Sequence, residues 1–136
     1  MRNRERASSV TGAETDILGW AAVNFTSLNT ANGALVVNLH GVPVPAPYDI
    51  ILLGPKTYGQ FGSYQYAVVS DQLEISLFVL ARDVNEFYAK YNQTVYDELE
   101  ALGYDTWLND PIQTFQEGCP VYTELDLSNC NSENGR

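Results

Sequence analysis

Residues 64–83, Tyr-Gln-Tyr-Ala-Val-Val-Ser-Asp-Gln-Leu-Glu-Ile-Ser-Leu-Phe-Val-Leu-Ala-Arg-Asp, decide the fold of this chain. Two runs rich in β-branched and aromatic residues, 64–70 and 74–81, flank a short turn, which is typical of a β-hairpin. The next segment, 84–103, has apolar residues at steps of three and four and predicts an amphipathic helix. The prediction of the fold therefore starts from a β-hairpin that leads directly into a helix.

Working back from the hairpin, three further strands are expected at 16–26, 34–42 and 48–53. The first two are separated by an Asn-Gly pair, which favours a turn, and a proline-rich loop at 42–47 ends the second. No room remains for crossover helices between these strands. The sequence thus predicts a mainly β fold, an antiparallel meander of about five strands with one C-terminal α-helix packed on its outside.

The chain of 136 residues is expected to form one domain. Residues 1–14 are polar and are interpreted as a flexible lead-in, and residues 15–122 hold the domain. A short strand is predicted at 111–116, and residues 123–136 are expected to be a disordered tail.

Composition argues against several partners. The net charge of −10 disfavours binding to nucleic acid or to an anionic membrane, because both reward clustered lysine and arginine. No apolar run approaches the roughly 20 residues that span a bilayer. No apolar segment comes after the basic N-terminus, so no signal peptide is predicted and the sequence does not decide the cellular compartment.

The sequence leaves three states open for Cys119 and Cys130: pairing with each other, pairing with another chain, and reduced thiols.

Catalytic signatures are not found in the sequence. His40 is the only histidine and is interpreted as solvated, and no second ligand stands at a metal-binding spacing. The serines lack an evident base, the carboxylates suggest no paired-acid cleft, and no phosphate-binding loop occurs. We therefore expect no enzymatic activity, no metal and no cofactor.

From about Asp16 to Tyr122 the chain resembles the lipocalins, and within them the apolipoprotein D and bacterial lipocalin branch. Each short match is weak alone, and the specificity comes from their order. The Thr-Asp-Tyr signature usual before the Tyr-Ala-Val strand is replaced by Gly62-Ser63-Tyr64. The matching pieces are Gly19-Trp20-Ala21, Gly33-Ala34-Leu35-Val36-Val37, Pro47-Tyr48-Asp49-Ile50, Tyr66-Ala67-Val68-Val69, Phe78-Val79-Leu80-Ala81-Arg82-Asp83, the helix and Pro111-Ile112-Gln113-Thr114.

The resemblance covers only the C-terminal portion of a lipocalin. The family opens with a Gly-x-Trp strand and two more strands, so about three of the eight barrel strands are expected to be missing here. We expect either a fragment, which we favour, or a half-barrel that closes by self-association. The resemblance also implies that Arg82 stacks over the opening tryptophan as a structural cation–π contact, and that tryptophan is among the missing residues. Cys119 likewise lies where some lipocalins place half of a disulfide, and Cys130 is the substitute partner.

Lipocalins are containers, so the resemblance implies a non-enzymatic carrier of a small hydrophobic ligand such as a fatty acid, a sterol or another lipid. Tyr48 is the expected polar anchor of the ligand. An ordinary core sealed by the helix is the competing interpretation of the same residues. A second function class is a structural or interaction module that forms a homodimer through open sheet edges. By strand alternation, the inner, ligand-lining face comprises Ile17, Val37, Leu39, Tyr48, Ile50, Leu52, Ala67, Val69, Phe78 and Leu80.

Overall fold

The computed structural model describes residues 1–9, 11–24, 33–71 and 73–118. The fold is mainly β: six strands succeed one another in the order β1-β2-β3-β4-β5-β6, and two helices come after them. The pairs β1–β2, β4–β5 and β5–β6 are all antiparallel. The elements are β1 (Arg2–Arg6), β2 (Glu14–Val23), β3 (Ala34–Leu39), β4 (Ala46–Leu53), β5 (Tyr66–Ser70), β6 (Leu77–Ala81), α1 (Val84–Lys90) and α2 (Asn92–Ala101).

The chain groups into two compact units. The first contains residues 1–22, 37–45 and the segment from 113 onward, and the second contains residues 23–36 and 46–112. Strand β3 contributes its first half to the second unit and its second half to the first. The β1–β2 pair therefore belongs to one unit, and β4, β5, β6 and both helices belong to the other.

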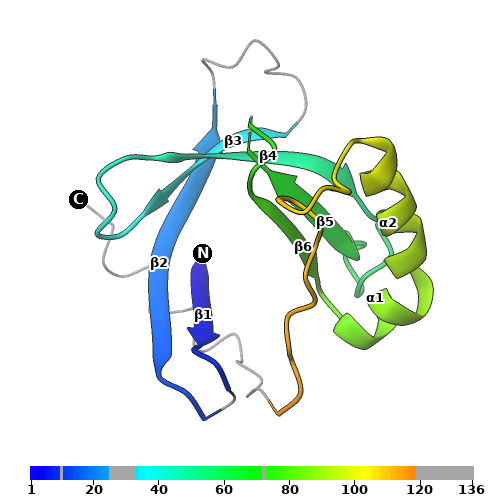
Figure 1. The fold of residues 1–136 in the computed structure, drawn as a ribbon, viewed down its shortest axis with the longest axis horizontal. Coiled ribbons are helices and arrows are strands. Elements are labelled where there is room, and N and C mark those ends of the chain that lie inside the picture. The colour runs from blue at the N-terminus through cyan, green and yellow to red at the C-terminus, as the bar shows by residue number, and fades with distance from the viewer. Residues whose placement is uncertain (10, 25–32, 72, 119–136) are drawn as a thin grey trace. The chain divides into compact units, whose positions relative to one another are not determined.

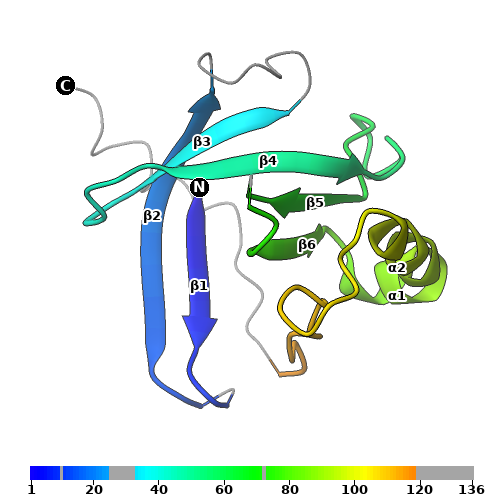
Figure 2. The same ribbon diagram turned by 45° about the horizontal axis from the view of Figure 1, so that its top comes forward.

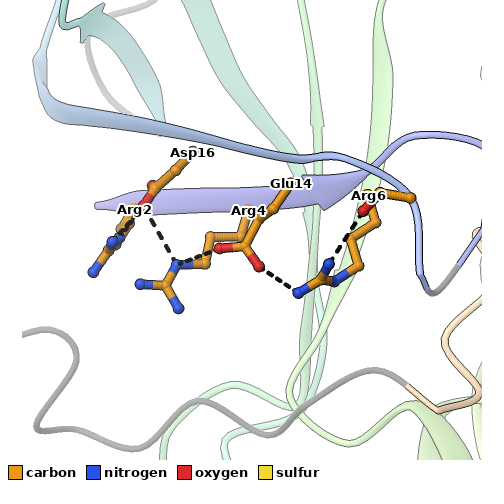
Figure 3. A network of polar contacts seen from close by, with 6 residues as sticks. Arg2, Arg4, Arg6, Glu14 and Asp16 are labelled. Atoms are coloured by element: carbon orange, nitrogen blue, oxygen red, sulfur yellow. Dashed lines mark hydrogen bonds and ion pairs between the residues drawn. The ribbon is translucent and has the colours of Figure 1, made fainter.

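An arginine–carboxylate ladder holds the β1–β2 pair together (Figure 3). Arg4 lies opposite Asp16 and Arg6 lies opposite Glu14, so the charged side chains share one face of the pair. Arg2 Nε donates to Asp16 Oδ2 at 2.6 Å, and Arg6 Nη2 lies 2.6 Å from Glu14 Oε2. The hydrogen bond from Arg2 and the nearby charge of Arg4 hold the pKa of Asp16 below its usual range, against the opposing effect of burial.

In the second unit, the β5–β6 pair and the two helices form the core. The register pairs Tyr66 with Ala81 and Val68 with Val79, and one face of this pair is covered by the helices (Figures 1 and 2). Val68 is fully buried and Leu99 of α2 is 1% exposed. The core cluster comprises Tyr66, Val68, Phe87, Val95, Leu99 and Tyr104.

Ring packing and one buried hydrogen bond fix the helices on the sheet. The Tyr66 ring meets the Phe87 ring edge-on with centroids 5.6 Å apart, and it meets the Tyr91 ring at 5.5 Å. Tyr104, just after α2, donates its hydroxyl proton to Ser70 Oγ at 2.7 Å inside the core. The Asp83 side chain caps α1 by accepting from the Glu86 N–H.

Glycine is required directly after the end of β4. Gly54 is buried, and a Cβ added there would lie 2.5 Å from the Tyr66 ring. The same residue donates its N–H to the Tyr66 carbonyl at 2.9 Å, so backbone and ring hold it from two sides. The sequence signal, Gly54-Pro55 after an apolar run, indicated the end of the strand and not this close approach.

Several predicted elements differ from the structure. Residues 2–6, expected within a flexible lead-in, form strand β1. The single predicted helix is two helices, because Tyr91 departs from helical geometry with φ −118° while its ring packs on Tyr66. Residues 111–116 are not in a strand, and β6 begins at Leu77 instead of residue 74. The expected continuation of β2 to residue 26 and the tail 123–136 lie outside the described residues.

The late start of β6 has a physical cause in the turn before it. Asp71 accepts hydrogen bonds from the backbone N–H groups of Leu73, at 2.7 Å, and Ser76, at 2.8 Å. Glu74 adopts a left-handed conformation with φ +58° inside this turn. Burial opposes ionisation of Asp71, but its hydrogen bonds outweigh burial and hold the pKa of this carboxyl below its usual range. An ionised Asp71 thus organises the β5–β6 turn.

Leu99→Ala tests the helix–sheet core. We expect it to lower the free energy of unfolding by about 2–5 kcal/mol, because it leaves a cavity against Val68 and Val95. Leu102→Ala is the matched control, since Leu102 is 49% exposed three residues further on. Urea unfolding monitored by circular dichroism measures both variants. Equal losses in the two would contradict this packing.

Asp71→Ala tests the turn and its pH dependence. The pKa of Asp71 is lower in the folded chain than its ordinary value, so the carboxylate stabilises the fold above that value. The stabilisation is lost as the pH falls through the folded pKa. We expect the melting temperature of the wild type to exceed that of Asp71→Ala at pH 7, with a gap that narrows below about pH 4. Asp105→Ala, at an exposed aspartate, serves as the control; a gap independent of pH would contradict the role of the charge.

Candidate functional site

The β4–β5–β6 part of the sheet has a second face, opposite to the side that the helices cover. Residues paired directly across antiparallel strands point to the same side. Val69 pairs with Phe78 on β6 and with Ile50 on β4, and Ala67 pairs with Leu80 and with Leu53. We call this set of six residues the apolar face: Ile50, Leu53, Ala67, Val69, Phe78 and Leu80.

Three of the six residues of the apolar face are exposed. Phe78 is 57% exposed, Leu80 is 48% exposed and Leu53 is 45% exposed. Val69, between them, is only 2% exposed. Contiguous exposed apolar side chains of this kind mark a surface that binds an apolar partner or ligand. Five of the six residues were predicted to share one face by strand alternation, and Leu53 was not.

A β-bulge in β4 corrects the prediction for Leu52. The register shifts between Ile50 and Leu52, so Leu52 pairs with Val68 and packs against the helix-side core. Strand alternation had placed Leu52 beside Ile50, but an inserted residue reverses the facing of the strand residues after it. Leu53 therefore takes the position on the apolar face that was predicted for Leu52. The unbroken run Ile50-Ile51-Leu52-Leu53 was the only sequence signal that alternation fails here.

Tyr48 and Asp49 of β4 lie on opposite sides. Tyr48 stands two residues before Ile50 with no register shift between them, so it extends the apolar face, and burial raises the pKa of its hydroxyl. Asp49 pairs with Ser70 and faces the helix side. Its Oδ1 atom is buried and has no hydrogen-bond partner among the described residues, which costs free energy. Asp49 therefore does not belong to the apolar face.

Three of the predicted ligand-lining residues lie in the first unit. Val37 is 6% exposed, and Ile17 and Leu39 are half-buried. Ile17 pairs with Asn3, on the face of the β1–β2 pair opposite to the arginine ladder. Their part in ligand binding stays a prediction. The remaining predicted residues are all in the second unit.

Arg82 contacts the loop between β4 and β5. Its guanidinium carbon lies 5.4 Å from the centroid of the Tyr58 ring, and its Nε donates to the Tyr64 carbonyl at 2.9 Å. The resemblance implied a cation–π contact with a tryptophan, and the described structure has one with a tyrosine that sequence analysis did not single out. Lys56 makes a second such contact, 4.9 Å from the Tyr64 ring centroid.

Other kinds of site find little support in the part of the chain that the structure describes. His40 is exposed at the end of β3, and no group of three or more His, Cys, Asp or Glu residues within the described ranges could hold a metal ion. Among those residues, neither helix is long and apolar enough to cross a membrane. Both cysteines lie outside the described residues.

The β4–β5–β6 part of the sheet is thus an antiparallel sheet with helices on one face and partly exposed apolar side chains on the other. Comparison with family models gives a match to the lipocalin domain over residues 35–133, which is more than half of the chain. The chain belongs to the lipocalin family, whose members bind small molecules and are generally not enzymes. No curated protein and no solved structure matched the chain.

Leu52→Ala and Leu53→Ala form a matched pair that tests the bulge. We expect Leu52→Ala to lower the free energy of unfolding by about 2 kcal/mol or more, because Leu52 packs on the core. Leu53→Ala removes a side chain that is nearly half exposed and is expected to cost under about 1 kcal/mol. Denaturant unfolding of both variants measures the two losses in the free energy of unfolding. A larger loss for Leu53→Ala would mean that β4 obeys simple alternation.

Proposed function

We propose that this chain is a non-enzymatic binding protein for a small hydrophobic ligand, such as a fatty acid, a sterol or another lipid. One observation carries the proposal: the helices cover only one side of β5 and β6, and Phe78 and Leu80 remain about half exposed on the other. Membership of the lipocalin family supports the same class of ligand.

The driving force would be burial of apolar surface. Removing such surface from water is worth about 25 cal/mol per Å², before the costs of ordering the ligand and the protein. The apolar face offers aliphatic side chains and one phenyl ring in direct cross-strand contact, and Tyr48 adds a ring with a polar end. A ligand that is mostly carbon, with few polar groups, fits these residues best.

Self-association is the second candidate function. In the strand order β6 has β5 as its only neighbour among the described strands, and the residues of β6 carry no charge. An uncharged apolar edge of this kind pairs readily with another strand. A homodimer through β6 would place a strand of the second copy beside Phe78 and Leu80 without any ligand.

Titration with Nile red, a neutral dye that fluoresces in apolar surroundings, tests the proposal. We expect saturable binding to the wild type and displacement of the dye by a long-chain lipid. Phe78→Ser should weaken binding by roughly tenfold or more, since burying a phenylalanine contributes about 1.5–3 kcal/mol. Leu73→Ser is the control, because Leu73 is an exposed apolar residue in the turn and not on the apolar face.

The same samples separate the two candidates. Size-exclusion chromatography with light scattering gives the oligomeric state over a range of concentrations. A monomer that binds dye saturably supports the ligand-binding function. A dimer without saturable dye binding would overturn it in favour of self-association, and equal effects of Phe78→Ser and Leu73→Ser would remove the apolar face as the site.

A further inference from the structure

Two turns of the second unit are joined by side-chain hydrogen bonds. One is the β5–β6 turn, and the other is the segment 103–110, which comes after α2. Asn109 Nδ2 donates to the Glu74 carbonyl at 3.3 Å. At the base of the same turn, the Tyr104 hydroxyl donates to Ser70 Oγ at 2.7 Å. The segment 103–110 is therefore held against the β5–β6 turn at two points.

Each turn is also ordered internally. Asp71 organises the β5–β6 turn through the backbone N–H groups that it accepts from. In the second turn, Asn109 Oδ1 accepts from the N–H of Thr106 at 3.1 Å and from its hydroxyl at 2.7 Å. The Asp110 N–H donates to the Thr106 carbonyl at 2.9 Å. A surface built on such turns is pre-organised, so a partner that binds there loses less free energy to ordering.

Large apolar side chains flank the contact between the two turns. Glu74 stands between Leu73 and Ile75 in the sequence, and Asn109 directly follows Leu108. The hydrogen bond from Asn109 to Glu74 therefore brings two pairs of apolar residues to neighbouring turns. We call these residues the turn patch: Leu73, Ile75, Trp107 and Leu108.

The turn patch is far more exposed than apolar residues in ordered turns usually are. Trp107 is 90% exposed, Leu73 is 76% exposed, and Ile75 and Leu108 are each 61% exposed. Tryptophan is highly buried on average, and it is enriched among the residues that dominate protein–protein binding. An exposed tryptophan among exposed aliphatic side chains thus marks an interaction surface. The turn patch shares no residue with the apolar face.

The charges of the two turns are all negative. Asp71 and Glu74 belong to the first turn, and Asp105 and Asp110 belong to the second. Neither turn contains a lysine or an arginine. In the described part of the chain, no ion pair joins these carboxylates to a cation. The turn patch therefore has an acidic rim that its own chain leaves uncompensated.

We propose that the turn patch binds a basic amphipathic segment of a protein partner. Apolar side chains of the partner would pack on Trp107 and its aliphatic neighbours, and lysines or arginines would meet the acidic rim. A second copy of this chain fits less well, because it would bring one acidic rim against another. An anionic membrane would be repelled for the same reason. This surface is independent of the proposed ligand-binding function.

Tryptophan fluorescence tests the proposal directly. The chain has two tryptophans, so Trp20→Phe leaves Trp107 as the only indole. The probe is a helical peptide of about 14 residues, made of leucine and lysine at amphipathic spacing. We expect the peptide to shift the emission of Trp20→Phe saturably to shorter wavelength, because Trp107 leaves water. Trp107→Phe is the matched control: it keeps a ring in the turn patch, and its remaining Trp20 should show no shift.

Substitutions locate the apolar contact. Fluorescence anisotropy of a dye-labelled peptide gives the affinity of each variant. Trp107→Ser should weaken binding by roughly tenfold or more. Phe61→Ser is the control, since it removes an aromatic ring that is 87% exposed and lies outside both turns. Phe78→Ser, on the apolar face, should also leave peptide binding unchanged.

Charge substitutions test the acidic rim. Glu74→Gln combined with Asp110→Asn should weaken binding several-fold, and added salt should weaken binding to the wild type. Glu98→Gln combined with Glu100→Gln removes the same charge from exposed positions of α2 and should change the affinity little. A peptide with glutamate in place of every lysine should not bind.

The remaining outcomes would overturn the proposal. No saturable shift in Trp20→Phe would do so, whatever the dye titration of the apolar face gives. Equal effects of Trp107→Ser and Phe61→Ser would remove the turn patch as the site, and equal binding of the two peptides would remove the role of charge. A shift caused by phosphatidylcholine vesicles and not by the peptide would identify a membrane surface as the occupant. If thermal melting shows that Trp107→Ser does not fold, Leu108→Ser replaces it with the same expectation.

Discussion

The packing of the two helices on one side of β5 is the contact on which the second unit depends. Val68 and Leu99 meet there with almost no exposure, and the tyrosines 66 and 104 add ring contacts and a buried hydrogen bond. Because β6 is apolar on both sides, covering one side leaves Phe78 and Leu80 on the other about half exposed. The core and the candidate site are therefore two consequences of one sheet, and the helices determine which residues belong to which.

The bulge in β4 refines that division. Without it, Leu52 would stand on the apolar face and Leu53 would face the helices; with it, the two exchange roles. Beyond the bulge, Gly54 carries the chain past the Tyr66 ring, and the ladder continues into the segment that holds Lys56 and Tyr58. A one-residue irregularity thus decides the composition of the apolar face.

Much of this architecture could be predicted from the pattern of apolar and polar residues along the sequence. The elements and contacts that were not predicted have identifiable physical causes. Alternation in 66–70 and 77–81 correctly separated Ala67, Val69, Phe78 and Leu80 from their neighbours, because neither strand contains a bulge. Strand β1 was missed because Arg2-Asn3-Arg4-Glu5-Arg6 has no apolar residue, and its pairing involves carboxylates eight to fourteen residues away. The cation–π contacts of Arg82 and Lys56 depend on loop geometry, which residue periodicity does not encode.

The arginine ladder has a consequence for how this chain would assemble with itself. The two terminal strands of the order β1-β2-β3-β4-β5-β6 differ in kind, since β1 is almost entirely charged and β6 is entirely uncharged. A charged terminal strand resists the addition of another strand, whereas β6 permits it. Pairing of β6 with β6 of a second copy would use the same surface on both partners and would leave only β1 at either end. In such a dimer, growth by strand addition would stop at two copies, because only the charged β1 strands would remain at its ends.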